Sequence, residues 1–189
     1  MTPASGKRSP LAGRSVAVFG SSEPADGEAD YARAREVGRL LAGAGARVVC
    51  GGYAGVMEAA SRGAREADGS VLGVTCALFT DREPNRWLTD RCEGRDLFER
   101  TRLLIDLSDA FIILPGKSGT IAELAFLWAL DRARLLGGKP IVLCGPAWPG
   151  LLGALETAGA LEPGQRRITG LAGGPEEAVS QIARRLAGE

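Results

Sequence analysis

The chain has 189 residues and carries 23 basic and 23 acidic side chains, so its formal net charge is zero. Zero net charge excludes the strongly basic surface of a non-specific nucleic-acid binder, and the lack of histidine excludes catalysis or metal binding through an imidazole. Hydrophobic residues make up 45% of the chain, which is enough for the core of one domain.

The sequence opens with polar and basic residues and then alternates between short apolar runs and longer segments of helical period. We expect residues 1–14 to form a flexible N-terminal tail and residues 15–189 to form a single domain. The apolar runs predict strands at residues 15–19, 47–50, 71–75, 110–114, 141–144 and, more weakly, 167–169. The segments between them predict helices at about 28–44, 56–67, 96–107, 120–135, 151–158 and 176–186.

The order of these elements predicts the class of fold. The strand runs are continuous and rich in β-branched residues, as in strands that are covered on both faces. Strands that alternate with helices at this spacing form βαβ units, so we expect an α/β fold with a mostly parallel sheet between two helical layers. The polar stretch 76–95 predicts a loop, in which Asn85 and Thr89 are expected to be solvated.

Three of the predicted strands are followed by loops of glycine and small residues. These loops are Gly20-Ser21-Ser22, residues 51–55 (GGYAG) and residues 115–120 (PGKSGT), and each precedes a predicted helix. Ligands of parallel sheets bind at the carboxyl ends of the strands, and backbone N–H groups at a helix N-terminus hold phosphate. The sequence therefore predicts a site for a small anionic ligand at these loops.

Two common nucleotide-binding motifs are excluded. Gly116-Lys117-Ser118 matches the end of a Walker A motif, but that motif needs a glycine at position 111, which is Phe111 here. No GxGxxG follows the first strand, and the second strand has no acidic residue at its end to bind a ribose. These departures disfavour a P-loop NTPase and an NAD-dependent dehydrogenase.

The segment 98–130 (FERTRLLIDLSDAFIILPGKSGTIAELAFLWAL) resembles the LOG (Lonely Guy) family, whose members were once misnamed lysine decarboxylases. The family signature PGGxGTxxE stands here as PGKSGTIAE at residues 115–123, and Arg100 matches the arginine on the preceding helix. The loops at Gly20–Ser22 and at residues 51–64 are similar to the family's other two loops. Lys117 departs from the second glycine of the signature, and Thr101 departs from the lysine that commonly follows the arginine.

The resemblance implies a Rossmann-like three-layer α/β/α fold, usually dimeric, and hydrolysis of the N-glycosidic bond of a nucleoside 5′-monophosphate. The products would be ribose 5-phosphate and a base, which is an N6-modified adenine in the cytokinin-activating members. No cofactor or metal is implied. The alternative is a non-catalytic nucleotide-binding or cofactor-carrier protein, since the same fold also includes nucleotide sensors and a molybdenum-cofactor carrier. A lysine decarboxylase is disfavoured, because only Lys117 lies near the candidate site as a Schiff-base lysine.

The candidate site residues follow from the motif and the loops. Glu123 and Arg100 are expected to be catalytic. The substrate-binding candidates are Ser21, Gly51, Gly52, Gly55, Gly116, Lys117, Ser118, Gly119 and Thr120. Lys117 either adds a phosphate contact or crowds the loop where the backbone meets the ligand.

Glu123 fits the chemistry of glycosidic cleavage, which passes through an oxocarbenium-like state. A carboxylate one turn into the helix would stabilise the ribosyl cation, act as nucleophile or activate water. Arg100 would orient it or bind ribose or phosphate. The competing interpretation is a capping box, in which Thr120 caps the helix and Glu123 bonds back to it.

The predicted helix 120–135 is apolar on all sides. Ile121, Leu124, Ala125 and Trp128 form one stripe, expected to face the core, while Phe126, Leu127 and Leu130 lie on the other side. This pattern predicts a homodimer with Glu123 close to a two-fold interface. The alternative is that the C-terminal helix of the same chain covers the second side.

The remaining composition bears on the compartment. Cys50, Cys76, Cys92 and Cys144 are widely spaced, and three of them follow apolar runs, so we expect free thiols that are mostly buried. No run reaches 18 apolar residues. We expect a cytoplasmic protein whose partner is a small nucleotide and not a nucleic acid or a membrane.

Overall fold

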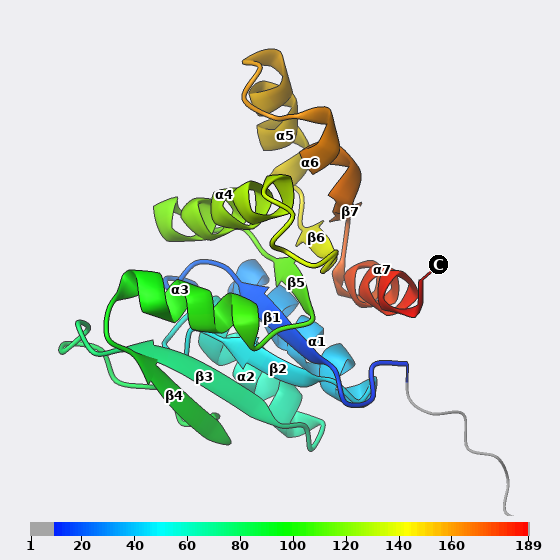
Figure 1. Cartoon of the computed structure of the whole chain (residues 1–189). Coiled ribbons are helices and arrows are strands. Elements are labelled where there is room, and N and C mark those ends of the chain that lie inside the picture. The colour runs from blue at the N-terminus through cyan, green and yellow to red at the C-terminus, as the bar shows by residue number, and fades with distance from the viewer. Residues whose placement is uncertain (1–9, 189) are drawn as a thin grey trace, which may run out of the picture.

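A computed structural model describes residues 10–188, which form one sheet of seven strands with helices on both sides (Figure 1). The strands are β1 (Ser15–Phe19), β2 (Arg47–Cys50), β3 (Val71–Cys76), β4 (Asp90–Gly94), β5 (Ala110–Ile113), β6 (Ile141–Cys144) and β7 (Thr169–Ala172). The helices are α1 (Ala29–Gly43), α2 (Val56–Glu66), α3 (Leu97–Asp106), α4 (Ser118–Arg132), α5 (Trp148–Thr157), α6 (Pro163–Ile168) and α7 (Pro175–Ala187). Among these helices, none is long and apolar enough to cross a membrane.

The sheet is parallel throughout, with the order β4-β3-β2-β1-β5-β6-β7. The chain starts in the middle at β1, builds outward to β4, and returns to β5 on the other side of β1. This confirms the predicted three-layer Rossmann-like fold. The order reverses between β1 and β5, which pair with Phe19 opposite Ile113, so their carboxyl ends lie level. Such a switch point is where parallel sheets bind ligands.

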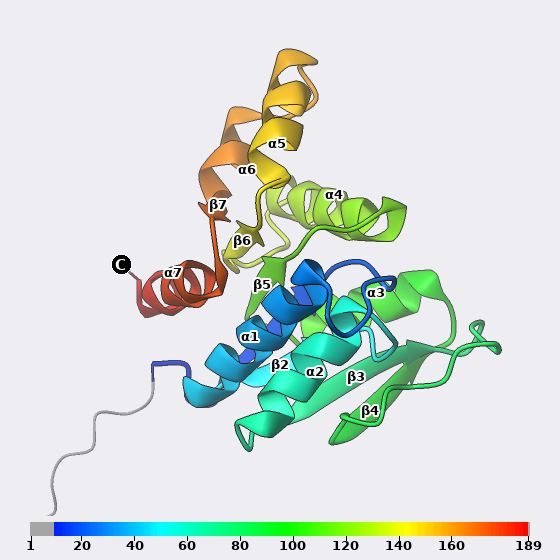
Figure 2. The ribbon, with the colours of Figure 1, turned by 180° about the vertical axis from the view of Figure 1, so that it is seen from behind.

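Alternate residues of β1 enter two separate cores. Val16 and Val18 pack with α1, α2 and α7, whereas Ala17 and Phe19 pack with α3, α4 and α5. Seen from behind, α1 and α2 lie over the first face of the sheet (Figure 2). A sheet buried on both faces explains why the predicted strands were apolar runs without alternation.

Most predicted elements lie within three residues of those observed, and the differences are local. The stretch 76–95 was predicted to be a loop, yet β4 pairs with β3 along the edge of the sheet. Its sequence, DRCEG, is mostly charged and exposed, as edge strands often are, so it carries no apolar signal. The weak strand predicted at 167–169 is also wrong in part, because residues 163–168 form α6, which begins with a capping box between Glu162 and Gln165, and β7 begins at Thr169.

The predicted N-terminal tail is only partly within the described chain. Residues 1–9 lie outside it. Residues 10–14 do not behave as a tail, because Leu11 is fully buried in the core beneath α1 and its N–H donates to the carbonyl of Ala44. A single leucine in a polar segment gave too little signal for this contact.

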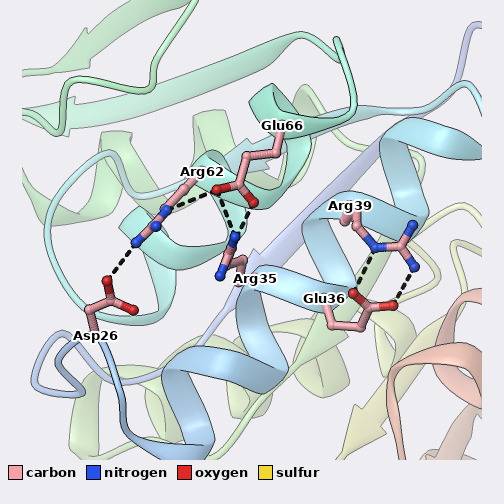
Figure 3. A network of polar contacts seen from close by, with 6 residues as sticks. All are labelled: Asp26, Arg35, Glu36, Arg39, Arg62 and Glu66. Carbon is pink, nitrogen blue, oxygen red and sulfur yellow. Dashed lines mark hydrogen bonds and ion pairs between the residues drawn. The ribbon is translucent and has the colours of Figure 1, made fainter.

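A network of ion pairs joins the β1–α1 loop (residues 20–28) to the two helices of the first layer (Figure 3). Arg62 on α2 contacts Asp26 of this loop at 2.7 Å and Glu66 at 3.0 Å. Arg35 on α1 binds the same Glu66 carboxylate with two hydrogen bonds. The network thus anchors the loop that carries Ser21.

Candidate active site

A pocket of about 350 Å³ lies at the carboxyl ends of β1 and β5, where the strand order reverses. Its wall combines the end of β1, the three glycine-containing loops, the first turn of α3 and the first two turns of α4. The predicted residues that line it are Ser21, Gly51, Arg100, Lys117, Ser118, Gly119, Thr120 and Glu123. The topology therefore brings the three loops together, as their positions after parallel strands predicted.

Ser21 is the point at which the three loops meet. Its N–H donates to the carbonyl of Pro115 at 3.2 Å, and its carbonyl accepts from the N–H of Val56 at 2.9 Å. Gly55 makes this approach feasible, because a Cβ there would lie 2.4 Å from the backbone of Ser22, and its φ of +69° favours glycine. The backbone at Ser21 thus fixes the mouth of the pocket.

The N-terminus of α4 points free donors at the pocket. Ile121 is the first residue whose N–H bonds within the helix, to the carbonyl of Lys117, so the N–H groups of Ser118, Gly119 and Thr120 have no helical partner. Thr120 lines the pocket, and within residues 10–188 its hydroxyl is not a buried unpaired group and has no hydrogen-bond partner, so it is open to a ligand. This cluster of donors suits an anion.

The Lys117 backbone adopts φ −95°, so this position does not require the glycine of the signature. Lys117 is the N-cap residue of α4 and gives no side-chain cap, which makes the capping-box interpretation of Thr120 and Glu123 wrong. Gly116 is needed for a different reason, since a Cβ there would lie 2.1 Å from Oγ1 of Thr120. The loop thus tolerates lysine beside an obligatory glycine.

Glu123 projects from the second turn of α4 toward Arg100 on α3. The closest atoms, Oε1 of Glu123 and Nη1 of Arg100, lie 3.9 Å apart. The Glu123 side chain is 17% exposed, and its burial raises the carboxyl pKa from 4.5 to about 7, against the opposing effect of Arg100. A carboxyl that titrates near neutral pH inside a pocket is typical of acid–base catalysis.

Arg100 is buried and held by main-chain carbonyls. Its Nε donates to Val74 at 2.9 Å, and its Nη2 donates to Gly51 at 3.1 Å. A Cβ at Gly51 would lie 1.9 Å from Nη2, and one at Gly94 would lie 2.6 Å from the Arg100 backbone. Both glycines therefore make room for the arginine. The two hydrogen bonds fix the orientation of the guanidinium, whose positive charge faces Glu123.

Part of the pocket wall consists of residues that were not among the predicted site residues. The rings of Tyr53 and Phe79 meet edge to face at 5.6 Å, and the guanidinium of Arg82 lies 4.4 Å over Phe79. Leu97 and Met57 also face the pocket. The signal that could have found Tyr53 and Phe79 is their position just after the second and third predicted strands. Tyr53 lies within the GGYAG loop that was predicted to bind the ligand, but no motif includes Phe79.

Three predicted binding residues, Gly52, Gly55 and Gly116, do not line the pocket. Gly52 instead accepts a hydrogen bond from the N–H of Asn85 at 2.8 Å, and Asn85 also donates through Nδ2 to the carbonyl of Tyr53. The prediction that Asn85 is solvated was therefore wrong. Asn85 holds the segment that carries Phe79 and Arg82 against the β2–α2 loop.

Helix α4 differs from its predicted orientation. Leu124 and Trp128 are buried as expected, but Leu127 joins them, while Ile121 and Ala125 face outward. The pattern could not set the buried face because apolar residues occur on every side of the helix. The C-terminal helix α7 packs on the opposite face of the sheet, so it does not cover α4.

Comparisons with known proteins identify the family of the chain and support its fold. The profile of the SLOG cluster4 family matches residues 13–145, which include the whole pocket. A cytokinin riboside 5′-monophosphate phosphoribohydrolase of Mycobacterium tuberculosis is 36% identical over 133 residues, covering 69% of this chain and 70% of that protein. Its counterpart in Rhodococcoides fascians is 35% identical, covering 69% and 67%. The solved molybdenum cofactor binding protein of Rippkaea orientalis has a TM-score of 0.73 at 23% identity, covering 92% of this chain and 97% of that chain, which supports the fold alone.

Proposed function

Because the chain belongs to the SLOG cluster4 family, we propose that it hydrolyses the N-glycosidic bond of a nucleoside 5′-monophosphate to a free base and ribose 5-phosphate. Its bacterial relatives are named for this activity on cytokinin riboside 5′-monophosphates. The observation that carries the proposal is a single pocket shared by the N-terminus of α4 and the largely buried carboxyl of Glu123. We propose that residues 15–189 act as one domain in this role.

In this proposal the phosphate binds at the N-terminus of α4. The free N–H groups of Ser118, Gly119 and Thr120, with the positive end of the helix dipole, attract a dianion. The unpaired hydroxyl of Thr120 and the hydroxyl of Ser21 supply further donors. Glu123 follows on the same side of the next turn, so ribose would extend from the phosphate toward its carboxyl.

Glu123 and Arg100 are the proposed catalytic residues. The oxygen of a water molecule bonds to C1′ of ribose, the C1′–N bond breaks, and its electron pair leaves with the base. Glu123 accepts the proton of the water and stabilises the cationic ribosyl group, and the base takes up a proton from solvent. A carboxyl pKa of about 7 suits this role at neutral pH. Arg100 orients the carboxylate and does not transfer a proton, because a guanidinium scarcely deprotonates.

We propose adenine or an N6-modified adenine as the base. The cytokinin substrates in the names of the relatives are the basis for this choice. The rings of Tyr53 and Phe79 and the side chain of Leu97 give the pocket an apolar wall, which supports a planar aromatic ligand.

The direct test is to incubate the protein with AMP, N6-isopentenyl-AMP and the other nucleoside monophosphates and to measure free base and ribose 5-phosphate. We expect cleavage by the wild type and a loss of about 100-fold or more in kcat for Glu123→Gln, since this change removes the proton acceptor. Glu36→Gln, on the exposed side of α1, is the matched control and should keep full activity. Full activity in Glu123→Gln would make the catalytic assignment wrong.

The alternative function has its own outcome in the same experiment. If no nucleotide is cleaved but one of them raises the melting temperature, the protein is a nucleotide-binding or carrier protein on this fold. The formation of free base and ribose 5-phosphate therefore distinguishes the enzyme from the binding protein.

We also propose that the protein is a homodimer through α3 and α4. Phe98 is 85% exposed and Phe126 is 45% exposed, and both line one groove with Leu130 and Leu135. Exposed aromatic side chains that gather in one groove, with charged residues around them, are typical of a protein–protein interface. Light scattering should give twice the chain mass for the wild type, and Phe126→Glu should give a monomer. A wild-type monomer at micromolar concentration would exclude this dimer.

The compartment and ligand class complete the proposal. All four cysteines are free, and three are buried, which supports a reducing compartment such as the cytoplasm. The balanced charge supports a small nucleotide as the partner and argues against a nucleic acid.

A further inference from the structure

An ion pair crosses the mouth of the pocket between two of its loops. Nζ of Lys117, at the start of α4, lies 2.6 Å from Oε1 of Glu23 in the β1–α1 loop. Both side chains line the pocket and both are exposed to solvent. Because Lys117 directly precedes Ser118, the pair lies beside the free N–H groups at the start of α4.

Hydrogen bonds connect the backbones of the two loops that carry this pair. The N–H of Glu23 donates to Oγ of Ser21 at 3.2 Å, and the backbone of Ser21 is itself bonded to Pro115. Lys117 stands where the signature has glycine, so its ammonium is a charge that this chain adds to the site. Glu23 supplies the counter-charge from the opposite loop.

We propose that Glu23 and Lys117 form a charge-exchange gate that selects ligands with a dianionic phosphate. The phosphate displaces the Glu23 carboxylate from Lys117 and takes its place, while Glu23 turns into solvent. The proposal rests on the phosphate position in the proposed function. It makes Lys117 and Glu23 specificity-determining residues for the charge of the ligand.

The physical basis is the difference in charge between the two anions that compete for Lys117, the ligand phosphate and the Glu23 carboxylate. A phosphate monoester carries about −1.5 to −2 at neutral pH, against −1 for a carboxylate, so it attracts Lys117 more strongly at equal distance. The exposed pair with Glu23 is weak and exchanges readily. A neutral sugar or nucleoside offers no charge to replace Glu23 and leaves the gate closed.

The test is calorimetric titration with ribose 5-phosphate and with ribose at pH 8. Ribose should bind too weakly to measure. For ribose 5-phosphate, Lys117→Gly should weaken binding about tenfold, and Glu23→Gln should tighten it about fivefold, because the competing carboxylate is gone. Glu28→Gln removes the same charge from the same loop but does not line the pocket, so it should leave the dissociation constant unchanged.

The double variant distinguishes exchange from simple repulsion. If Glu23 acts by occupying Lys117, Glu23→Gln should have no effect in the Lys117→Gly background. A fivefold effect that persists there would overturn the gate, as would tighter binding in Lys117→Gly. Titration with ribose 5-phosphate needs no cleavage, so the gate can stand if no nucleotide is hydrolysed, and hydrolysis can stand if Glu23→Gln changes nothing.

Discussion

The two helical layers of the sheet are built differently. On one face, α1 and α2 touch backbone to backbone, since a Cβ at Gly38 would lie 2.0 Å from the carbonyl oxygen of Ala60 and one at Gly63 would lie 1.8 Å from that of Arg35. On the other face, α3 and α4 expose Phe98 and other large apolar side chains. Within residues 10–188, none of the large exposed hydrophobic residues lies on α1, α2 or α7.

This contrast separates stability from function. In the α1–α2 layer, glycines let the two helices pack closely, and ion pairs join their exposed sides. The α3–α4 layer carries a buried arginine, a carboxyl with a raised pKa and several exposed large apolar side chains. Such groups reduce the stability of an isolated chain, and they gather where the proposed substrate and second subunit would bind.

The largest expected effect on the free energy of unfolding comes from the contact between α1 and α2. Gly38→Ala should lower the free energy of unfolding by about 3 kcal/mol, because the new methyl group forces α1 away from α2. Gly43→Ala, at the exposed end of the same helix with open space around it, is the control and should be neutral or slightly stabilising. Urea denaturation measures both. A Gly38→Ala protein as stable as its control would mean that the helices are not in close contact.

The next effect tests whether the α3–α4 layer is destabilised by its own site. Folding raises the pKa of Glu123 from 4.5 to about 7, so between these values the unfolded chain ionises while the folded chain keeps its proton. Stability is therefore lost as pH rises through this window and stays lower above pH 7. The full shift corresponds to about 3 kcal/mol, and partial exposure reduces our expectation to about 2 kcal/mol.

Glu123→Gln removes this titration. It should be more stable than the wild type at pH 8 by about 2 kcal/mol, and the difference should shrink toward pH 5. Urea denaturation at the two pH values measures it, with Glu36→Gln as the control on the α1–α2 layer. An equal difference at both pH values would show that the buried carboxyl is not the cause.

The same contrast explains what could be predicted from the sequence. The strands and helices were predictable because a parallel sheet buried on both faces produces continuous apolar runs. Strand β4 was missed because an edge strand with a sequence such as DRCEG lacks that signal. In α4 the apolar residues surround the helix, so the pattern gave the helix but not its buried face.

The sequence predicted the parts of the candidate site that lie in glycine loops or in the family motif. Glycine loops after strands located the pocket, and the motif gave Glu123 and Arg100. Tyr53, Phe79 and Glu23 were missed because their roles depend on which loops meet in space. Gly51 was predicted as a ligand contact, and it lines the pocket, but its lack of a side chain is required by Arg100. The spacing of residues in the sequence does not show that Gly51 and Arg100 are in contact.

The smallest expected effect tests whether ion pairs in the α1–α2 layer influence ligand binding in the pocket. Asp26→Asn breaks the ion pair between the β1–α1 loop and Arg62 (Figure 3). The pair is exposed, so the melting temperature should change by less than about 1 °C. The loop loses one of its anchors, however, and the dissociation constant of ribose 5-phosphate should rise about twofold.

Glu36→Gln breaks a similar pair with Arg39 that does not touch the loop, and it should change neither quantity. If both variants bind ribose 5-phosphate like the wild type, the backbone bonds of Ser21 suffice to hold the loop, and the two layers are independent.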